Sequence, residues 1–426
     1  MNERLLQFIW QFRYYQAHHL QTTDGQPLQV LHPGTWNTNQ GPDFANARIQ
    51  IGNTLWAGAV EIHLKTSDWQ RHGHTGDAHY EPVVLHVVWQ HDQTEQPNQI
   101  PILELQPRVS SLMLHQYEQW MGSQEAVPCH QQLSHTPSIT WQSWKDRLLT
   151  ERLQQKIQAL EQHLQQTKGH WEEVFWRLLC RYMGGHINGE SFEQVAVSLP
   201  VTILARHKAQ IHQLEAMLLG QAGLLHARFD DKYAQMLYKE YQFLQQKYSL
   251  RVVNKPPSHL RLRPANFPAI RLAQVAMLIH QSTQLFSQLR QATDLKQVWP
   301  LLTATANDYW ADHFKPDLAA EGRAPRSIGR QMQEVLLINA VVPVLFAYGR
   351  LQGDPAQTEK ALQWLQAMPA EKNQPTAIFR QAGLLQQAYD SQAALHLRKQ
   401  YCDARRCLEC AIGNSLLRQA PKPNGS

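Results

Sequence analysis

Apolar and polar positions in the first part of the chain change with the short period of β-strands. The runs 47–51 and 55–65 flank Gly52-Asn53, a pair typical of a tight hairpin turn. In the second run, successive residues fall on opposite faces of the strand. The run 83–89 is almost continuously apolar, which predicts a buried strand, and 98–105 predicts another short strand.

From about Thr136 onward the apolar positions recur with a helical period. One face of a long amphipathic helix is marked by Leu149, Leu153, Ile157, Leu160 and Leu164. Further helices are predicted over 171–182, 208–219, 233–248, 269–289 and much of the last hundred residues. Prolines 256, 257, 264 and 268 predict a hinge or linker over 251–268.

These patterns predict an α+β fold in which a mixed α/β region precedes a mainly α-helical C-terminal region. We expect a mixed α/β domain over 1–125, a helical domain over 126–255 and a second helical domain over 256–426. The length of 426 residues agrees with two or three domains, each able to bury a core.

Composition narrows the class of protein. At 43% hydrophobic and 18% charged residues, the chain is expected to be globular, and disorder, collagen and a coiled-coil rod are excluded. Glu3 and Arg4 argue against a secretory signal at the start, and the longest apolar stretch, 335–348, is interrupted by Asn339 and Pro343. We therefore expect a cytoplasmic protein with no membrane partner. The net charge of +5 permits a polyanionic partner without requiring one.

The first candidate site lies on two neighbouring strands. Asp43 stands at the head of one, and Glu61, His63 and Lys65 share one face of the next. Paired carboxylates are oxygen ligands suited to Mg²⁺ or Mn²⁺, which can polarise a phosphodiester and activate water. A basic residue beside that metal could orient the water, so we predict a catalytic role for His63 or Lys65.

The order of helix, Pro-Asp, strand, Glu-x-basic residue, helix and strand resembles the PD-(D/E)XK nuclease superfamily. The motif is carried by Pro42-Asp43 and Glu61-Ile62-His63. The resemblance implies a restriction-endonuclease-like N-terminal domain that binds a divalent metal and hydrolyses nucleic acid. His63 occupies the usual lysine position, and Lys65 follows two residues later.

An alternative interpretation treats these residues as ordinary strand and turn chemistry, because polar positions that alternate along a strand usually face solvent. The functional interpretation is favoured by the number of polar side chains that the strand order would gather. Asn39 and Gln40 join Asp43, Glu61 and His63 in that set, and we expect both to contact nucleic acid.

A second polar cluster follows the strand that carries Glu61. Its members His72, His74 and Asp77, with His63 or His86, could bind Zn²⁺ or another transition metal. His72 and His74 could instead contact phosphates or cap the next segment. His86 lies within the apolar run VVLHVVW and is better explained as a hydrogen-bonded core histidine.

Three of the five cysteines, Cys402, Cys407 and Cys410, form the pattern Cys-x4-Cys-x2-Cys. Thiols this close together indicate a structural metal, with Zn²⁺ preferred and an iron–sulfur cluster as the alternative. Cys129 is the first choice for a fourth ligand, ahead of His396 and Cys180. The competing interpretation is a group of free or buried thiols.

A basic segment, RLRPANFPAIRLAQ, contains Arg261, Arg263 and Arg271. Arginines near a helix start and an aromatic residue could bind a phosphate backbone or a flipped base. The same segment also fits a linker whose arginines pair with carboxylates.

Several longer motifs together resemble domain-of-unknown-function family 2851, a bacterial family. They are GPDFANARI, LWAGAVEIHLKTSDWQRHGHTGDAHY, LRLRPANFPAIRLAQ and YCDARRCLECAIG, and the resemblance spans about Leu5 to Leu417. It implies that the candidate site and the cysteine tail belong to one protein design, and it supplies no activity.

The leading hypothesis from the sequence is a metal-dependent nuclease in which Asp43 and Glu61 hold Mg²⁺ or Mn²⁺. DNA or RNA would then be its partner. One competitor is a nucleic-acid-binding or scaffolding protein without catalysis. The other is a metallohydrolase of another class, centred on His63, His72, His74 and Asp77.

Overall fold

The computed structural model describes residues 1–37, 40–93 and 100–419 and divides into two compact units. The first unit contains Met1–Asp146, Pro375–Leu384 and the chain from Leu395 onward. The second contains Arg147–Gln374 and Leu385–Ala394. A mixed β-sheet in the N-terminal region and a largely helical remainder confirm the expected α+β class. The three-domain division at 125 and 255 stays a prediction.

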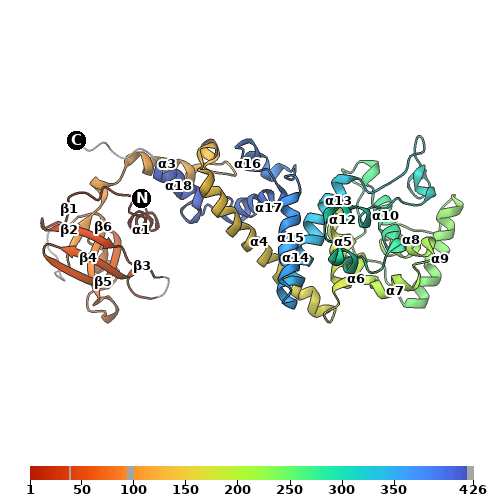
Figure 1. Ribbon diagram of the computed structural model, residues 1–426, viewed down its shortest axis with the longest axis horizontal. Coiled ribbons are helices and arrows are strands. Elements are labelled where there is room, and N and C mark those ends of the chain that lie inside the picture. Colours follow the sequence, from red (N-terminus) through yellow and green to blue (C-terminus); the bar gives the residue numbers. More distant parts are fainter. Residues whose placement is uncertain (38–39, 94–99, 420–426) are drawn as a thin grey trace. The chain divides into compact units, whose positions relative to one another are not determined.

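The first unit is built on a seven-stranded mixed sheet in the order β1-β2-β4-β5-β6-β7, with β3 paired to β4 (Figure 1). Strands β2, β4 and β5 are antiparallel, whereas β5, β6 and β7 are parallel. The bounds are β1 Leu20–Gln21, β2 Pro27–His32, β3 Thr35–Trp36, β4 Phe44–Ile51, β5 Thr54–Lys65, β6 Val83–Gln90 and β7 Ile102–Glu104.

The predicted hairpin at Gly52-Asn53 is confirmed, because Ile51 pairs with Thr54 across the turn. Gly52 has φ of +56°, a left-handed conformation that favours glycine. The two strands on either side of this turn carry Asp43 and Glu61 toward the same region of the sheet, since Phe44 pairs with Val60.

Strand β5 is buried on both faces over residues 59–63. The apolar β6 lies beside it, and helix α1 (Glu3–Gln11) packs on it through a face that includes Leu5 and Ile9. The alternative interpretation of this segment as a solvated sheet face is therefore wrong. Polar side chains at Glu61 and His63 are held inside the protein, where they need partners.

Short helices complete the first unit around the sheet. They include α2 Asp68–Arg71, η1 Ala78–Tyr80, η2 Gln106–Arg108, α3 Ser111–Gly122, η3 His130–His135, α16 Ala377–Gln381, η8 Arg398–Cys402, η9 Cys407–Glu409 and α18 Ala411–Gln419. Helix α18 packs against α3, η3 and η9. The C-terminal segment is therefore part of the same compact body as the N-terminal sheet.

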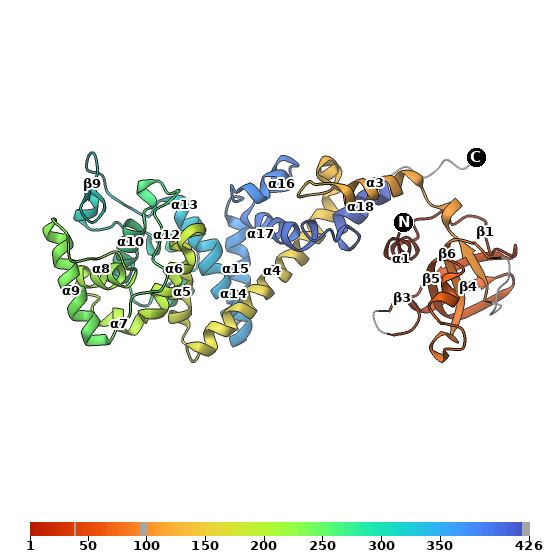
Figure 2. The same ribbon diagram turned by 180° about the vertical axis from the view of Figure 1, so that it is seen from behind.

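The second unit is helical apart from the hairpin of β8 (His313–Lys315) and β9 (Leu318–Ala319). Two helices, α4 Ser138–Gln166 and α17 Ala388–Leu397, run from one unit into the other. The unit also contains α5 Trp171–Met183, α6 Gly185–Ser198, α7 Val201–Arg206, α8 Ile211–Gln221, α9 Lys232–Tyr248, α10 Pro268–Gln281, α11 Leu285–Gln291, α12 Leu295–Leu301, α13 Arg330–Leu336, α14 Val342–Gln352 and α15 Pro355–Ala367 (Figure 2). The 310-helices η4 Pro264–Asn266 and η5 Asp308–Ala311 also lie here, and η7 Gln374–Thr376 begins at its edge.

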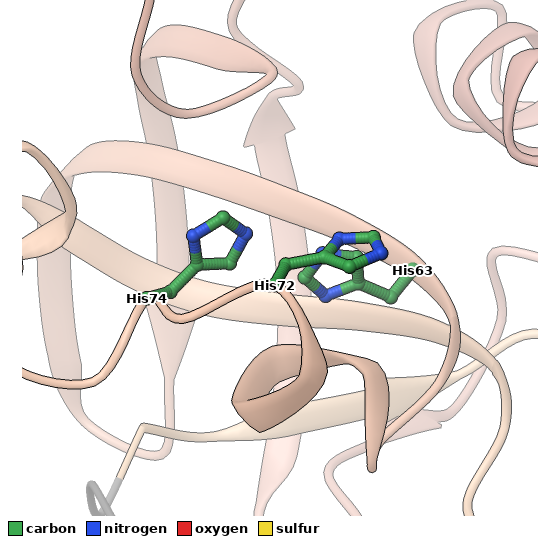
Figure 3. Close-up of side chains that lie close together, drawn as sticks. All are labelled: His63, His72 and His74. Carbon is green, nitrogen blue, oxygen red and sulfur yellow. The ribbon is translucent and has the colours of Figure 1, made fainter.

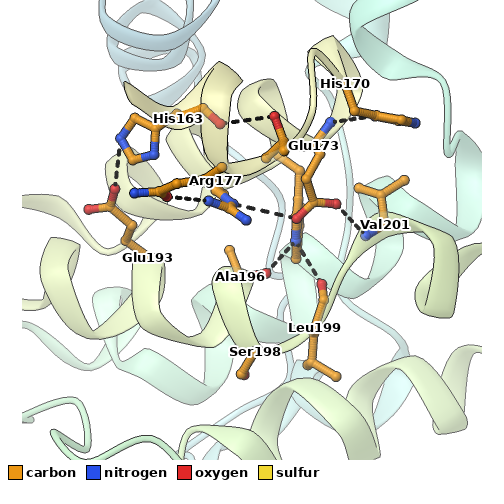
Figure 4. A network of polar contacts seen from close by, with 12 residues as sticks. His163, His170, Glu173, Arg177, Glu193, Ala196, Ser198, Leu199 and Val201 are labelled. Atoms are coloured by element: carbon orange, nitrogen blue, oxygen red, sulfur yellow. Dashed lines mark hydrogen bonds and ion pairs between the residues drawn. The ribbon is translucent and has the colours of Figure 1, made fainter. Parts of the chain in front are cut away.

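Polar contacts fix the packing of α5 against α6 and α7 (Figure 4). The Oε2 of the buried Glu173 accepts a 2.8 Å hydrogen bond from the backbone N–H of Val201, at the start of α7. The indole of Trp176 donates to the carbonyl oxygens of Ala196 and Leu199, at the end of α6. One face of α5 therefore satisfies backbone groups at the end of one helix and the start of the next.

The helix predicted over 269–289 is wrong as a single element, because it is divided into α10 and α11. Ser282 is extended, with φ of −155°, and its hydroxyl accepts from the N–H of Gln284. This local hydrogen bond competes with the helical ladder. The irregular segment over 251–263 agrees with the proline pattern and lies inside the second unit.

Helix α13, the π-helical turn η6 (Leu337–Val341) and α14 form one continuous helix over Arg330–Gln352. Asn339 and Pro343 interrupt the apolar stretch of the sequence but not the helix, because the wider turn precedes Pro343, whose ring has no N–H to donate. This helix is long and apolar enough to cross a membrane, and 67% of its most apolar window is buried inside the protein. Such burial is typical of a core helix.

Candidate metal centre

Three histidines converge beside the parallel part of the first unit's sheet (Figure 3). His63 projects from β5, and His72 and His74 come from the loop that follows α2. One ring nitrogen of each lies within 4.8 Å of the others. His72 Nδ1 is 3.2 Å from His63 Nε2. The side chains aim their donor atoms at a common point, as metal ligands do.

A carboxylate from β5 lies beside two of the three histidines. Glu61 Oε1 lies 3.4 Å from His63 Nε2 and 3.4 Å from His74 Nε2. Glu61 and His63 are 5% and 1% exposed, so both side chains depend largely on partners within the protein. We call Glu61, His63, His72 and His74 the histidine–glutamate cluster.

The short helix α2 directs the loop back toward the sheet. Asp68 is almost fully buried, and its Oδ2 accepts from the N–H of Lys65 while its Oδ1 pairs with Arg71. Gly73 follows with φ of +74°, and the N–H of His74 then donates to the carbonyl oxygen of Trp69. This turn places two histidines that are close in sequence against a third from the strand.

His86 supports the cluster from β6. It pairs in register with Glu61, is 3% exposed, and its Nε2 lies 2.9 Å from His63 Nδ1. The expectation that His86 is a hydrogen-bonded core histidine is confirmed. When His63 Nδ1–H donates to His86, His63 Nε2 keeps a free lone pair toward the cluster, which is the arrangement of a metal-binding histidine.

The structure brings Asp43 and Glu61 together, as the strand order suggested. The backbone N–H of Asp43 donates to Glu61 Oε2 at 3.0 Å. Asp43 Oδ2 accepts from the N–H of Ile62, and its Oδ1 accepts from the side chain of Gln7 on α1. The Gln7 contact was not foreseen, because no short motif links α1 to the sheet.

Electrostatics favour a cation at this position. Burial raises the pKa of Asp43 to about 6. Burial, followed by the Asp43 charge, raises the pKa of Glu61 to about 8. Two buried carboxylates repel each other when both are ionised, and a bound cation relieves that repulsion.

The imidazoles are suited to coordination. Burial, followed by the neighbouring histidines, lowers the pKa of His63 to about 2, and burial lowers that of His86 to about 3. A neutral imidazole is the form that binds metal. The His74 ring is stacked on Tyr80 with centroids 3.7 Å apart, which fixes its orientation.

Other expected site residues lie outside this contact network. Lys65 is exposed at the end of β5, and its charge acts on Asp92. Asp77 accepts from the backbone and ring of His79, although its charge also reaches His74. Gln40 is exposed, and Asn39 lies outside the described residues.

The three arginines of the basic segment belong to the second unit. Arg261 and Arg263 are exposed, and their expected contact with nucleic acid stays a prediction. Arg271 donates to Asn266 Oδ1 and to Gln274 Oε1. Its guanidinium therefore already has amide partners within its own helix and the turn before it.

The four cysteines expected to bind metal, Cys129, Cys402, Cys407 and Cys410, are buried and unbridged in the first unit. Cys180 is fully buried in α5 of the second unit, in agreement with a core role. His396 is also buried, near the ring of Tyr401.

Fold and cluster together define an α+β protein that holds three histidines close together beside a mixed sheet, with a glutamate next to two of them. The chain belongs to the family described as protein of unknown function (DUF2851), which matches residues 3–374. No curated protein and no solved structure is significantly similar to it.

Proposed function

We propose that this protein is a metal-dependent hydrolase of nucleic-acid phosphodiesters, with the metal bound by the histidine–glutamate cluster. The observation that carries the proposal is the convergence of one ring nitrogen each from His63, His72 and His74, with Glu61 Oε1 beside His63 and His74. Adjacent donors in this group lie 3.2 to 3.4 Å apart. Ligands of one ion have such spacing when each is about 2.0 to 2.2 Å from the metal.

The ligand types favour a first-row transition metal ion. Imidazole suits first-row transition metals such as Zn²⁺ and Fe²⁺, whereas Mg²⁺ takes oxygen ligands and keeps most of its water. Three imidazoles and one carboxylate therefore favour Mn²⁺ over Mg²⁺. Of the two ions expected from the carboxylate pair, we select Mn²⁺ for the proposal.

Two observations support a phosphodiester substrate. The chain has α1, β1 to β3, Pro42-Asp43, β4, β5 with Glu61 and His63, α2, η1 and β6, an order that contains the elements of the PD-(D/E)XK pattern among others. The net charge of +5 permits an anionic partner, and the exposed guanidinium of Arg71 lies one residue before His72.

The metal and Asp43 would have different roles in the hydrolysis. The metal would polarise the phosphate and lower the pKa of a water molecule. Asp43, with a pKa near 6, is suited to accept that water's proton near neutral pH. The water oxygen bonds to phosphorus, the bond from phosphorus to one bridging oxygen breaks, and that oxygen takes a proton from solvent as it leaves.

The test combines metal binding with cleavage. Titration calorimetry would measure Mn²⁺ affinity for the wild type, Glu61→Gln, His74→Ala and the control His79→Ala, which alters an exposed histidine of the same loop. Single- and double-stranded DNA and RNA would be incubated with each protein and Mn²⁺, alongside Asp43→Asn. We expect Glu61→Gln and His74→Ala to lose Mn²⁺ affinity and cleavage, and His79→Ala to retain both.

The outcomes separate the competing functions. Cleavage that is equal in the wild type and Glu61→Gln contradicts the proposal, because the activity then comes from elsewhere. Mn²⁺ binding with no cleavage of any nucleic acid also overturns it and favours the non-catalytic binding or scaffolding role.

A further inference from the structure

Four cysteine thiols from distant parts of the sequence are gathered in the first unit. Cys129 comes just before η3, and Cys402, Cys407 and Cys410 come from the segment between η8 and α18. Each of the four residues is 7% exposed, and none forms a disulfide. Thiols buried together and unbridged are typical of a metal-bound set.

The segments that carry the thiols are packed together, because α18, which follows Cys410, lies against η3, which follows Cys129, and against η9, which begins at Cys407. Burial raises the pKa of the Cys129 thiol, and the thiols of Cys410 and Cys407 raise it further. The pKa of Cys402 is raised by burial and then by all three of the others. The isolated cysteine and the three clustered ones therefore form one group.

The backbone that carries this group is tightly fixed. Arg405 has φ of +53°, and its guanidinium donates to the carbonyl oxygens of Ser123 and Glu125, just before Cys129. A Cβ atom at Gly413 would overlap the carbonyl oxygen of Cys407. The two cysteine-bearing segments are thus held together by contacts other than the thiols themselves.

We propose that Cys129, Cys402, Cys407 and Cys410 bind an iron–sulfur cluster. The spacing Cys-x4-Cys-x2-Cys is that of plant-type ferredoxins, except that here the remote cysteine precedes the run. This proposal is independent of the hydrolase proposal, since it involves different residues.

The separation of the sulfurs favours a cluster over a single zinc ion. Four thiolates about 2.3 Å from one tetrahedral zinc lie roughly 3.8 Å from each other. Among the described residues, the histidines form the group of three donors within 4.8 Å, and the thiols do not form one. A cluster with several irons accepts thiolates that are farther apart.

Burial raises the pKa of all four thiols, so a bound metal must displace their protons. The charges of Arg398 and Arg405 offset this rise only in part, at Cys402 and Cys407 respectively. The backbone N–H groups of Gly413 and Ile412 act in the same direction on Cys410. Such N–H groups directed at sulfur also stabilise the negative charge of a cluster.

The position of the cluster indicates a structural role. Arg4 of α1 pairs with Glu409, and the hydroxyl of Tyr14 donates to the side chain of Asn414. Gln7 of the same helix donates to Asp43. An iron–sulfur cluster at the four cysteines would therefore hold the C-terminal segment against α1. The same helix contacts Asp43 of the candidate metal centre through Gln7.

The test measures the iron and sulfide content and the visible absorption spectrum of the full chain, purified without oxygen. We expect the wild type to contain iron and acid-labile sulfide and to absorb visible light. The control Cys180→Ser, which alters a buried cysteine outside the group, should behave identically, and Cys407→Ser should lose iron, sulfide and colour.

Because Cys407→Ser could unfold the unit, a second measurement uses the wild type alone. Iron and sulfide would be removed with a chelator under oxidising conditions and then supplied again, with far-ultraviolet circular dichroism recorded throughout. Return of the visible absorption on folded protein supports the proposal. Stoichiometric zinc without sulfide overturns it, and so does a wild-type protein that takes up neither iron nor sulfide.

Discussion

His63 and His86 illustrate how one residue can prepare another for metal binding. Their ring nitrogens lie 2.9 Å apart, so one ring must donate and the other must accept. Donation by His63 would leave its second nitrogen, which lies 3.4 Å from Glu61 Oε1, without a proton and able to bind a metal. His86 itself does not belong to the three-histidine group and contacts that group through His63.

Replacing His86 with Phe should therefore weaken Mn²⁺ binding about 10- to 100-fold while retaining most of the core volume. The ring of His63 would lose the acceptor that fixes its orientation. Calorimetric titration of the variant beside the wild type would measure the change. Unaltered affinity in a folded variant would show that His86 acts only as a core residue.

Glu215 is a buried carboxyl with a different role. Its Oε1 accepts from Asn307 and from the indole of Trp310, and its Oε2 accepts from the hydroxyl of Tyr233. Burial nevertheless raises its pKa from 4.5 to about 7. The folded protein thus holds this proton more tightly than the unfolded chain.

The stability contributed by this group is fully present below pH 4.5 and decreases as the pH rises through about 7. The loss amounts to about 3 kcal/mol for a shift of this size. Urea unfolding of the wild type and Glu215→Gln at pH 5 and pH 8 (about 1 unit above the folded pKa) should show a smaller pH dependence in the variant. Parallel pH profiles for the two proteins would contradict the assignment.

Only some of the individual residues of the candidate site could be predicted from the sequence. Asp43 and Glu61 could be paired because a hairpin joins their strands, and the His72-x-His74 spacing marked a possible ligand pair. Gln7 could not be found, since its contact with Asp43 depends on how α1 packs on β5. Lys65 shares a strand face with Glu61 but lies where β5 emerges into solvent.

Among the elements, α5 shows how one helix determines where others begin and end. Its apolar face was evident from sequence periodicity, and its bounds were predicted within one residue. The hydrogen bond from Val201 to Glu173 could not be predicted, because it links positions 28 residues apart through tertiary packing. The break between α10 and α11 was missed for a local reason, the competing hydroxyl of Ser282.

Glu173→Ala should destabilise the second unit by about 1 to 3 kcal/mol, because the N–H of Val201 would lose its buried acceptor. The matched control is Glu190→Ala, which removes an exposed pair with Lys255 and should leave stability nearly unchanged. Chemical denaturation followed by circular dichroism compares the two. A similar effect of both substitutions would indicate that the Glu173 bond contributes little.

In the whole molecule, the first unit is assembled from separated parts of the chain. Residues 1–146 supply the sheet, and the segment from Leu395 onward supplies η8, η9 and α18. Sequence patterns are local, so the helical character of this segment could be predicted, whereas its inclusion in the N-terminal unit could not. Only the cysteine spacing, with Cys129 as a suggested partner, indicated such a connection.

A chain that ends at residue 403 should therefore lose the fold of the first unit while the second remains folded. The truncation removes the buried Ile412, Leu416 and Leu417, each of which contributes about 1.5 to 3 kcal/mol by burial. Limited proteolysis with mass spectrometry should find cleavage within 1–146 and protection of 147–374. A chain that ends at residue 419 serves as the control, and equal protection of 1–146 in both would contradict this prediction.

The divided first unit also sets an order of events during protein synthesis. A ribosome releases residues 1–146 early, then the whole second unit, and only afterwards the segment with η9 and α18. Cys129 can therefore approach Cys407 and Cys410 only after nearly all of the described chain has been translated. A chain whose synthesis stops before that point lacks the last part of the first unit. The four thiols can therefore come together only in a translation product that extends to α18.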